Sequence, residues 1–179
     1  MIFVFWYFSR NSVGLHPLRL RNSRLKLLRL LNPQLQHISL TTETKYMEQY
    51  PGDDVIDIMG ISLYCDAPQG DTLQVDNYAS LLDKQLTMLA SLGKQHSKPI
   101  AVAETGYNGI KTDNWWTQTL APILQRHPLS YVLLWSNTGP DHFFVPYPGH
   151  HSTSDFVRFY NLPATLFRQD INGPYNSRE

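Results

Sequence analysis

Three nearly continuous apolar runs divide the chain and predict buried strands. They span residues 55–64, 100–103 and 130–135, and apolar and polar positions do not alternate within them. A strand that is apolar at almost every position is buried on both faces, as in a parallel sheet covered by helices. We therefore expect three neighbouring strands at the centre of the fold.

Between the first two runs, apolar residues recur at the spacing of a helix. The preceding loop contains Pro68 and Gly70, and Asp76 is the predicted N-cap. The helix is expected to continue to Gly93 and to bury one face. That face is formed by Tyr78, Leu81, Leu82, Leu86, Leu89 and Leu92.

Two further helical patterns follow the second run. One covers residues 114–127, and Pro122 within it should kink or split the helix near Thr119 because proline has no backbone N–H. The other covers residues 154–160, and residues 164–171 are expected to add another helical turn or two. Strands and helices thus alternate with short connections.

This alternation predicts an α/β fold in which right-handed crossovers join parallel strands. A doubly wound sheet and a (β/α) barrel both satisfy the pattern. No glycine-rich fingerprint follows any of the predicted strands, which argues against a nucleotide-binding sheet. A chain of 179 residues has the length of one domain.

Composition separates residues 1–44 from residues 45–179. The whole chain has 15 basic and 15 acidic residues, so its charge does not indicate nucleic acid as a partner, yet no acidic residue precedes Glu43. The aromatic run at residues 2–8 is too short to span a bilayer and makes a poor signal peptide. Residues 1–44 are therefore expected to be an atypical N-terminal segment, and one hypothesis is that they are foreign to the fold, through truncation or a reading-frame error upstream.

The leucine- and arginine-rich residues 15–31 have helical spacing. An amphipathic helix packed on the main domain is one interpretation of this segment, and one that lies on a membrane surface is another. Sequence that does not belong to the fold is the third. The single cysteine, Cys65, excludes an internal disulfide and is expected to be a buried structural thiol.

The three predicted strands end in residues that carry chemistry. Glu104 ends the second strand, Tyr64 the first and Trp135 the third, and Gly106 is expected to allow a sharp exit after Glu104. The carboxyl ends of parallel strands form one rim, where catalysis takes place in α/β barrels. From the pattern alone, Glu104 is either a catalytic carboxylate or half of a surface ion pair.

Several motifs in order resemble the C-terminal half of glycoside hydrolase family 26. They are Tyr-Pro-Gly-Asp-Asp, Ala-Val-Ala-Glu-Thr-Gly, a Trp-Trp pair, Tyr-Val-Leu-Leu-Trp-Ser-Asn and Phe-Val-Pro-Tyr-Pro-Gly-His, between Lys45 and Ile171. The family consists mostly of endo-β-1,4-mannanases on a (β/α)8 TIM barrel. The resemblance implies a partial barrel over residues 45–179 that holds the sixth to eighth strands with their helices, the N-terminal half being missing or replaced.

The resemblance also implies roles for three residues. Glu104 matches the catalytic nucleophile, Tyr64 the tyrosine whose hydroxyl contacts it, and Trp135 the floor under the sugar that is cleaved. Retaining hydrolysis needs such a carboxylate, a donor that keeps it ionised and an aromatic face. The implied substrate is mannan, glucomannan or galactomannan, and the implied location of the protein is extracellular or periplasmic. No metal or other cofactor, nucleic acid partner or membrane span is expected.

Departures from the family pattern point to an incomplete site. Ser136 stands where the family usually has an arginine, and Ser62 where it usually has an aspartate. The His-Glu-Met-Asn type motif that carries the acid/base is absent from the sequence. Asp66 and Asp141 are poor substitutes, better suited to turn capping and solvation. We expect the chain alone to be inactive or nearly so, and poorly folded, because half a barrel leaves strand edges unpaired.

The sequence is also compatible with two alternative functions. The chain is alternatively a non-catalytic carbohydrate-binding remnant that keeps Tyr64 and Trp135, or a family relative acting on β-1,3-xylan or mixed-linkage glucan. The histidines at 142, 150 and 151 do not fit a known zinc spacing, and solvent exposure or contact with sugar hydroxyls suits them better. Trp115 and Trp116 are expected in the core.

Overall fold

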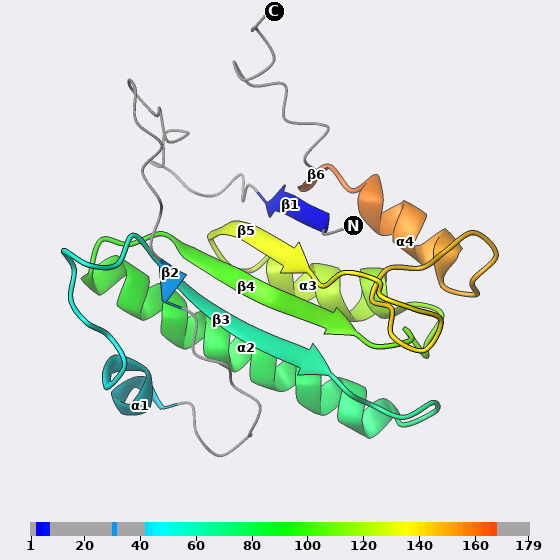
Figure 1. Ribbon diagram of the computed structural model, residues 1–179, viewed down its shortest axis with the longest axis horizontal. Coiled ribbons are helices and arrows are strands. Elements are labelled where there is room, and N and C mark those ends of the chain that lie inside the picture. The colour runs from blue at the N-terminus through cyan, green and yellow to red at the C-terminus, as the bar shows by residue number, and fades with distance from the viewer. Residues whose placement is uncertain (1–2, 8–29, 32–41, 168–179) are drawn as a thin grey trace, which may run out of the picture.

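Three parallel strands form the centre of the sheet, as the apolar runs predict. The computed structural model describes residues 3–7, 30–31 and 42–167. The central strands are β3 (Ile58–Cys65), β4 (Ile100–Tyr107) and β5 (Leu129–Leu134), and β4 pairs in parallel with both of the others. They lie side by side in Figure 1.

Three short strands extend this centre to a six-stranded sheet with the order β2-β3-β4-β5-β1-β6. On one side, β2 (Leu30–Leu31) pairs in parallel with β3. On the other, β1 (Phe3–Tyr7) runs antiparallel to both β5 and β6 (Thr165–Phe167). The described part of the chain is therefore an open α/β sheet rather than a closed barrel.

The longest helix, α2 (Thr72–Gln95), covers one face of the sheet together with the shorter α3 (Ala121–Leu124) (Figure 1). The buried face of α2 contains four of the five expected leucines, Leu81 being only half-buried, and packs on β3 and β4. Two other helices are α1 (Glu43–Met47) and α4 (Thr153–Tyr160). Among the described residues, none of the helices has the length and apolar character needed to cross a membrane.

Helix α2 begins five residues before the predicted start, so the N-cap prediction at Asp76 is wrong. The cap is Asp71, whose carboxylate accepts a hydrogen bond from the backbone N–H of Gln74 at 2.9 Å. Asp76 lies on the exposed side of the first turns. Two aspartates five residues apart both precede apolar positions, and the tight turn after Pro68 favours the earlier one.

The predicted split near Pro122 is confirmed. A π-helix, η1 (Trp115–Leu120), is followed directly by α3, and Pro122 lies in the first turn of α3, where proline is favoured. The N-terminal N–H groups of η1 are held by the buried Asp155 of α4, which accepts from Trp116 N at 2.9 Å and Thr117 N at 3.1 Å.

The helical turns predicted over residues 164–171 are wrong where the structure describes them. Residues 165–167 form β6, because β1 offers an antiparallel partner with Phe5 opposite Phe167. Leu30 and Leu31, at the end of the segment with helical spacing, are likewise a strand paired to Ile58 and Met59. The rest of that segment and residues 168–171 lie outside the described residues.

Candidate active site

Glu104 lies within β4 rather than at its end, which corrects the predicted strand boundary. The strand continues through Gly106 to Tyr107. Gly106 does not make a sharp exit; a β-carbon on it would meet the ring of Phe144 at 2.5 Å, so glycine is required there for close approach. β3 similarly continues one residue beyond Tyr64.

A β-bulge decides which face of the sheet carries Glu104. Opposite the consecutive residues Ile61 and Ser62 of β3, β4 places Val102 and Glu104, so Ala103 is an extra residue. The pairing of β4 with β5 shifts at the same place, between Val102 and Thr105. An extra residue reverses the alternation of side chains beyond it.

The reversal is visible in the packing. Before the bulge, Ile100 and Val102 belong to the core beneath the helices, and after it Tyr107 does so. Thr105 also faces the helices, because its hydroxyl lies 2.7 Å from the hydroxyl of Tyr78 on α2. Glu104 is consequently turned to the face away from α2, where it is half-buried.

Tyr64 reaches Glu104 from the neighbouring strand. The hydroxyl of Tyr64 donates to Oε2 of Glu104 at 2.9 Å. Burial, the hydrogen bond to Glu104 and the negative charge of that carboxylate all raise the pKa of Tyr64 above its usual range. The phenol therefore stays protonated and remains a donor to the carboxylate at physiological pH.

Trp135 follows β5 directly and is half-buried. Its backbone N–H donates to the carbonyl oxygen of Thr105 at 3.1 Å, so the residue that follows Glu104 is tied to the end of β5. The register thus brings the backbones of all three predicted site residues to neighbouring strands.

The sequence analysis missed Tyr131. Val132 and Leu134 of β5 belong to the core under the helices, so Tyr131 lies on the opposite face, shared with Glu104. Burial and the charge of Glu104 raise the pKa of Tyr131. Tyr131 lies four residues before Trp135, and a strand places residues at this spacing on the same face. This spacing is the sequence signal that could have identified Tyr131.

The loop after β5 forms an open pocket of about 400 Å³, lined by Asn137, Gly139, Pro140, Phe143 and Tyr147. Asn137 shapes the loop, since its side-chain oxygen accepts from the backbone N–H groups of Phe144 and Val145. Phe144 packs edge-on against Tyr64 with ring centres 5.6 Å apart. Asn137, which lines the pocket, is thus linked through Phe144 to Tyr64, the partner of Glu104.

The three histidines of this region have separate partners. His142 is exposed and bonded to Thr138, and His151 is paired with Asp113 at 2.6 Å. Half-buried His150 packs against Phe143 and Tyr147, and burial and neighbouring His151 lower its pKa. Within the described residues no cluster of three metal-ligating side chains occurs.

Other residues singled out from the sequence have the expected surroundings. Trp115 and Trp116 are fully buried, which confirms them as core. Cys65 is buried too, and burial raises the pKa of its thiol to about 11, consistent with a structural role. Asp66 and Asp141 are both exposed.

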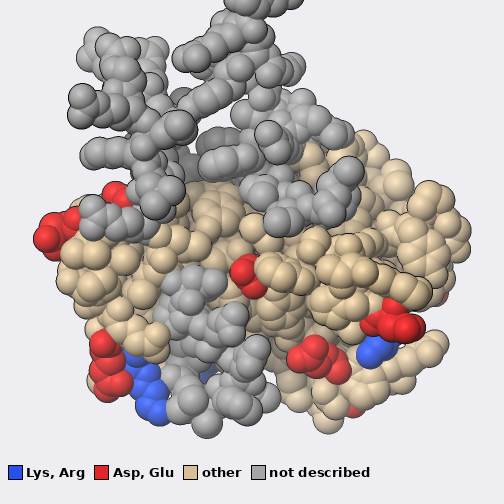
Figure 2. Space-filling view, in the orientation of Figure 1, with Lys and Arg blue, Asp and Glu red and all other residues tan. Residues whose placement is uncertain are grey.

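The surface around these elements carries little charge. Figure 2 shows a face on which neutral side chains predominate and acidic and basic groups are scattered. An α/β sheet that presents a half-buried carboxylate, its tyrosine partner and a nearby aromatic pocket has the features of an α/β enzyme.

The comparisons with known proteins agree with this class. No family model matches the chain. Among solved structures it is similar to a family 26 β-mannanase from Bacteroides ovatus, with 38% identity and a TM-score of 0.71 over 85% of this chain and 43% of that one. A family 26 protein from a Muricauda species shows 26% identity and a TM-score of 0.66 over 80% of this chain and 38% of that one.

Two more relatives carry mannanase names. The modular endo-β-1,4-mannanase from Cellulomonas fimi has 25% identity and a TM-score of 0.63 over 84% of this chain and 34% of that one. The mannan endo-1,4-β-mannosidase of Bifidobacterium adolescentis is 24% identical over 149 residues, which are 75% of this chain and 15% of that protein. The resemblance to glycoside hydrolase family 26 is thus confirmed, and the chain spans less than half the length of these relatives.

Proposed function

We propose that the chain is a fragment of a retaining endo-β-1,4-mannanase in which Glu104 is the nucleophile. Strands β3, β4 and β5 correspond to the sixth, seventh and eighth strands of the barrel, and residues 45–179 form that half. Residues 1–44 are a separate segment, which contacts this half through β1 and β2.

The hydrogen bond between Tyr64 and Glu104 supports this assignment most strongly. In retaining hydrolysis a carboxylate oxygen attacks the anomeric carbon, the bond to the leaving oxygen breaks, and water later cleaves the glycosyl ester. A carboxylate that accepts a hydrogen bond from a phenol and is turned out of the core suits the first step. Trp135 would provide the apolar floor for the sugar ring.

We assign no residue as the second carboxylate that the reaction requires. Retaining enzymes hold two carboxyl groups roughly 5–5.5 Å apart, and the exposed Asp66 and Asp141 are not suited to the acid role. We therefore propose that the chain alone does not hydrolyse mannan at an appreciable rate. A sugar whose leaving group departs without protonation does not need the missing general acid.

The test uses such a sugar. The chain is incubated with 2,4-dinitrophenyl 2-deoxy-2-fluoro-β-mannoside, and its peptides are analysed by mass spectrometry. Attack by Glu104 expels dinitrophenolate with its electron pair and leaves a fluoromannosyl ester on that residue. We expect the adduct on Glu104 and its absence in Glu104→Gln; an adduct on another residue, or none on the wild-type chain, would overturn the assignment.

A carbohydrate-binding remnant is the second candidate, favoured by the aromatic pocket and by Tyr147, which is 52% exposed there. Isothermal titration with mannohexaose, β-1,3-xylan and mixed-linkage glucan fragments compares the possible ligands. Binding of one of them without formation of an adduct on Glu104 would favour this candidate. Because the proposed substrates are polysaccharides, we place the intact protein outside the cell or in the periplasm.

A further inference from the structure

One buried threonine of β4 is hydrogen-bonded to β3 and to the residue that follows β5. Thr105 follows Glu104 in β4 and is completely buried. Its hydroxyl donates to the carbonyl oxygen of Leu63 in β3 at 2.8 Å, and its own carbonyl oxygen accepts from the backbone N–H of Trp135 at 3.1 Å. Leu63 immediately precedes Tyr64, so each bond ends at a candidate site residue or next to one.

Helix α2 supplies another partner. The hydroxyl of Tyr78 lies 2.7 Å from Oγ1 of Thr105. Because the single hydroxyl hydrogen of Thr105 is directed to Leu63, Tyr78 is the donor in this contact. Both side chains are buried, so water does not compete for these bonds. The threonine side chain is thereby fixed from the helix side as well as from β3.

The position of Thr105 coincides with the end of the bulge. Ala103 is the extra residue of β4. Pairing with β3 resumes at Glu104, opposite Ser62, and pairing with β5 resumes at Thr105, which lies opposite both Leu63 and Leu134. If the strand lost the bulge and slipped by one residue, Glu104 would turn into the core beneath α2. The hydroxyl bonds of Thr105 oppose this slip, because they are satisfied only when Thr105 itself faces the helix.

We propose that Thr105 is a positioning residue for the candidate site. It holds the bulge in β4 and so keeps Glu104 within hydrogen-bond distance of Tyr64, with the backbone of Trp135 fixed beside them. It does not touch the sugar. The catalytic consequence rests on the function proposed above, whereas the geometric consequence does not.

The experiment reads the Tyr64–Glu104 contact directly. The full chain is labelled with ¹³C at tyrosine Cζ, and the Tyr64 signal is assigned from its loss in Tyr64→Phe. Glu104→Gln gives the position of this signal without the carboxylate. Thr105→Val removes the hydroxyl at nearly constant shape, and Thr105→Ser restores it. The matched control is Tyr46→Phe, which removes another buried hydrogen bond to β3, from Tyr46 to the carbonyl oxygen of Gly60.

In Thr105→Val we expect the Tyr64 signal to move to its position in Glu104→Gln, whereas Thr105→Ser and Tyr46→Phe retain the wild-type position. The rate of fluoromannosyl ester formation should fall roughly 100-fold in Thr105→Val, the effect of a displacement of about 1 Å. If Thr105→Val does not fold, Tyr78→Phe takes its place and should shift the signal part of the way.

Two results would overturn the proposal: an unmoved Tyr64 signal in the folded Thr105→Val or its replacement Tyr78→Phe, or an equal shift in Tyr46→Phe. A wild-type chain that forms no ester contradicts the proposed nucleophile instead, and the position of the Tyr64 signal still decides the role of Thr105.

Discussion

Glu104 has its place in the site because β4 contains one residue more than β3 where the two strands pair, and the pairing of β4 with β5 shifts at the same place. The extra residue, Ala103, turns the carboxylate away from the helices, where the hydroxyl of Tyr64 donates to it. We infer that the hydrogen bonds of Thr105, the next residue, stabilise this bulge. A side chain that would otherwise be buried under α2 is thereby available to a ligand.

At the same scale, we predict that Tyr64→Phe lowers the rate of ester formation on Glu104 by roughly 100-fold, the usual effect of losing one donor to a reacting oxygen. The matched control is Tyr107→Phe, because the hydroxyl of Tyr107 is buried on the helix face and donates to the carbonyl oxygen of Ala67. Trapping kinetics by mass spectrometry compare the two variants. Equal losses in both would mean that Tyr64 acts through stability alone.

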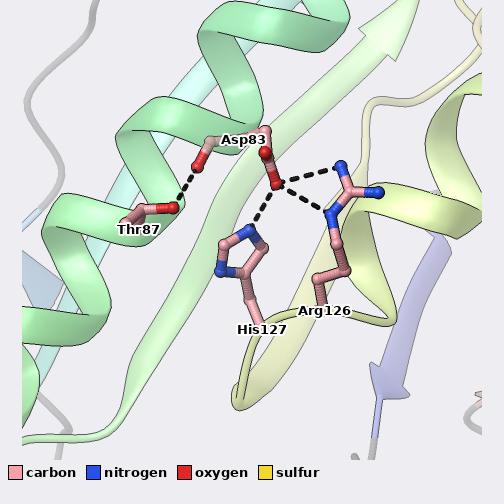
Figure 3. Close-up of polar contacts among 4 residues, drawn as sticks. All are labelled: Asp83, Thr87, Arg126 and His127. Atoms are coloured by element: carbon pink, nitrogen blue, oxygen red, sulfur yellow. Dashed lines mark hydrogen bonds and ion pairs between the residues drawn. The ribbon is translucent and has the colours of Figure 1, made fainter.

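At the scale of elements, one ion-pair cluster links α2 to the turn that precedes β5 (Figure 3). The carboxylate of Asp83 accepts from Nε2 of His127 at 2.8 Å and from Nε and Nη2 of Arg126 at 3.1 and 3.0 Å. The side chain of His127 is only 8% exposed. The cluster therefore positions the start of β5 relative to α2.

This cluster predicts a pH dependence of stability. The hydrogen bond from His127, and then that from Arg126, hold the pKa of Asp83 below its usual value. The stabilisation is therefore complete above the pKa of the unfolded chain, about 4, and is lost as the pH falls through the lower folded value. Asp83→Asn should lower the free energy of unfolding by about 1 kcal/mol at pH 7, and the difference should shrink below pH 4.

Denaturant unfolding followed by tryptophan fluorescence measures this difference at several pH values. Asp76→Asn is the control, since Asp76 lies exposed on the same helix. It should leave the free energy of unfolding nearly unchanged throughout. A loss in Asp83→Asn that persists undiminished to pH 2 would contradict the assigned linkage.

The central strands and the split at Pro122 were predictable because continuous apolar runs and a proline within a helix leave clear local signals. The bulge was not, since Ile100 to Ala103 is apolar at every position and an added residue does not alter that pattern. The strand character of residues 165–167 depends on pairing with β1, more than 150 residues earlier in the chain, which no local pattern contains. The order of the motifs pointed to Glu104, Tyr64 and Trp135 as candidate site residues. Thr105 and Tyr131 could be recognised only from the pairing of β4 with β3 and β5.

At the scale of the whole molecule, the described residues form part of an open sheet similar to portions of much longer mannanases. Within the described chain, β3 pairs with β4 over Met59 to Cys65 but with β2 only at Ile58 and Met59. An edge of this kind promotes association with other strands. We therefore expect low stability, and a candidate site that contains the nucleophile without its acid.

Chemical rescue of Glu104→Ala tests the central claim most directly. The variant is given 2,4-dinitrophenyl β-mannoside and sodium azide, and the product is identified by NMR. Azide entering the space left by the carboxylate attacks the anomeric carbon from that side, expels dinitrophenolate and inverts the centre. We predict α-mannosyl azide from the variant, and dinitrophenolate release but negligible mannan hydrolysis from the wild-type chain. Formation of β-mannosyl azide, or unchanged dinitrophenolate release in Glu104→Ala without azide, would contradict Glu104 as the nucleophile.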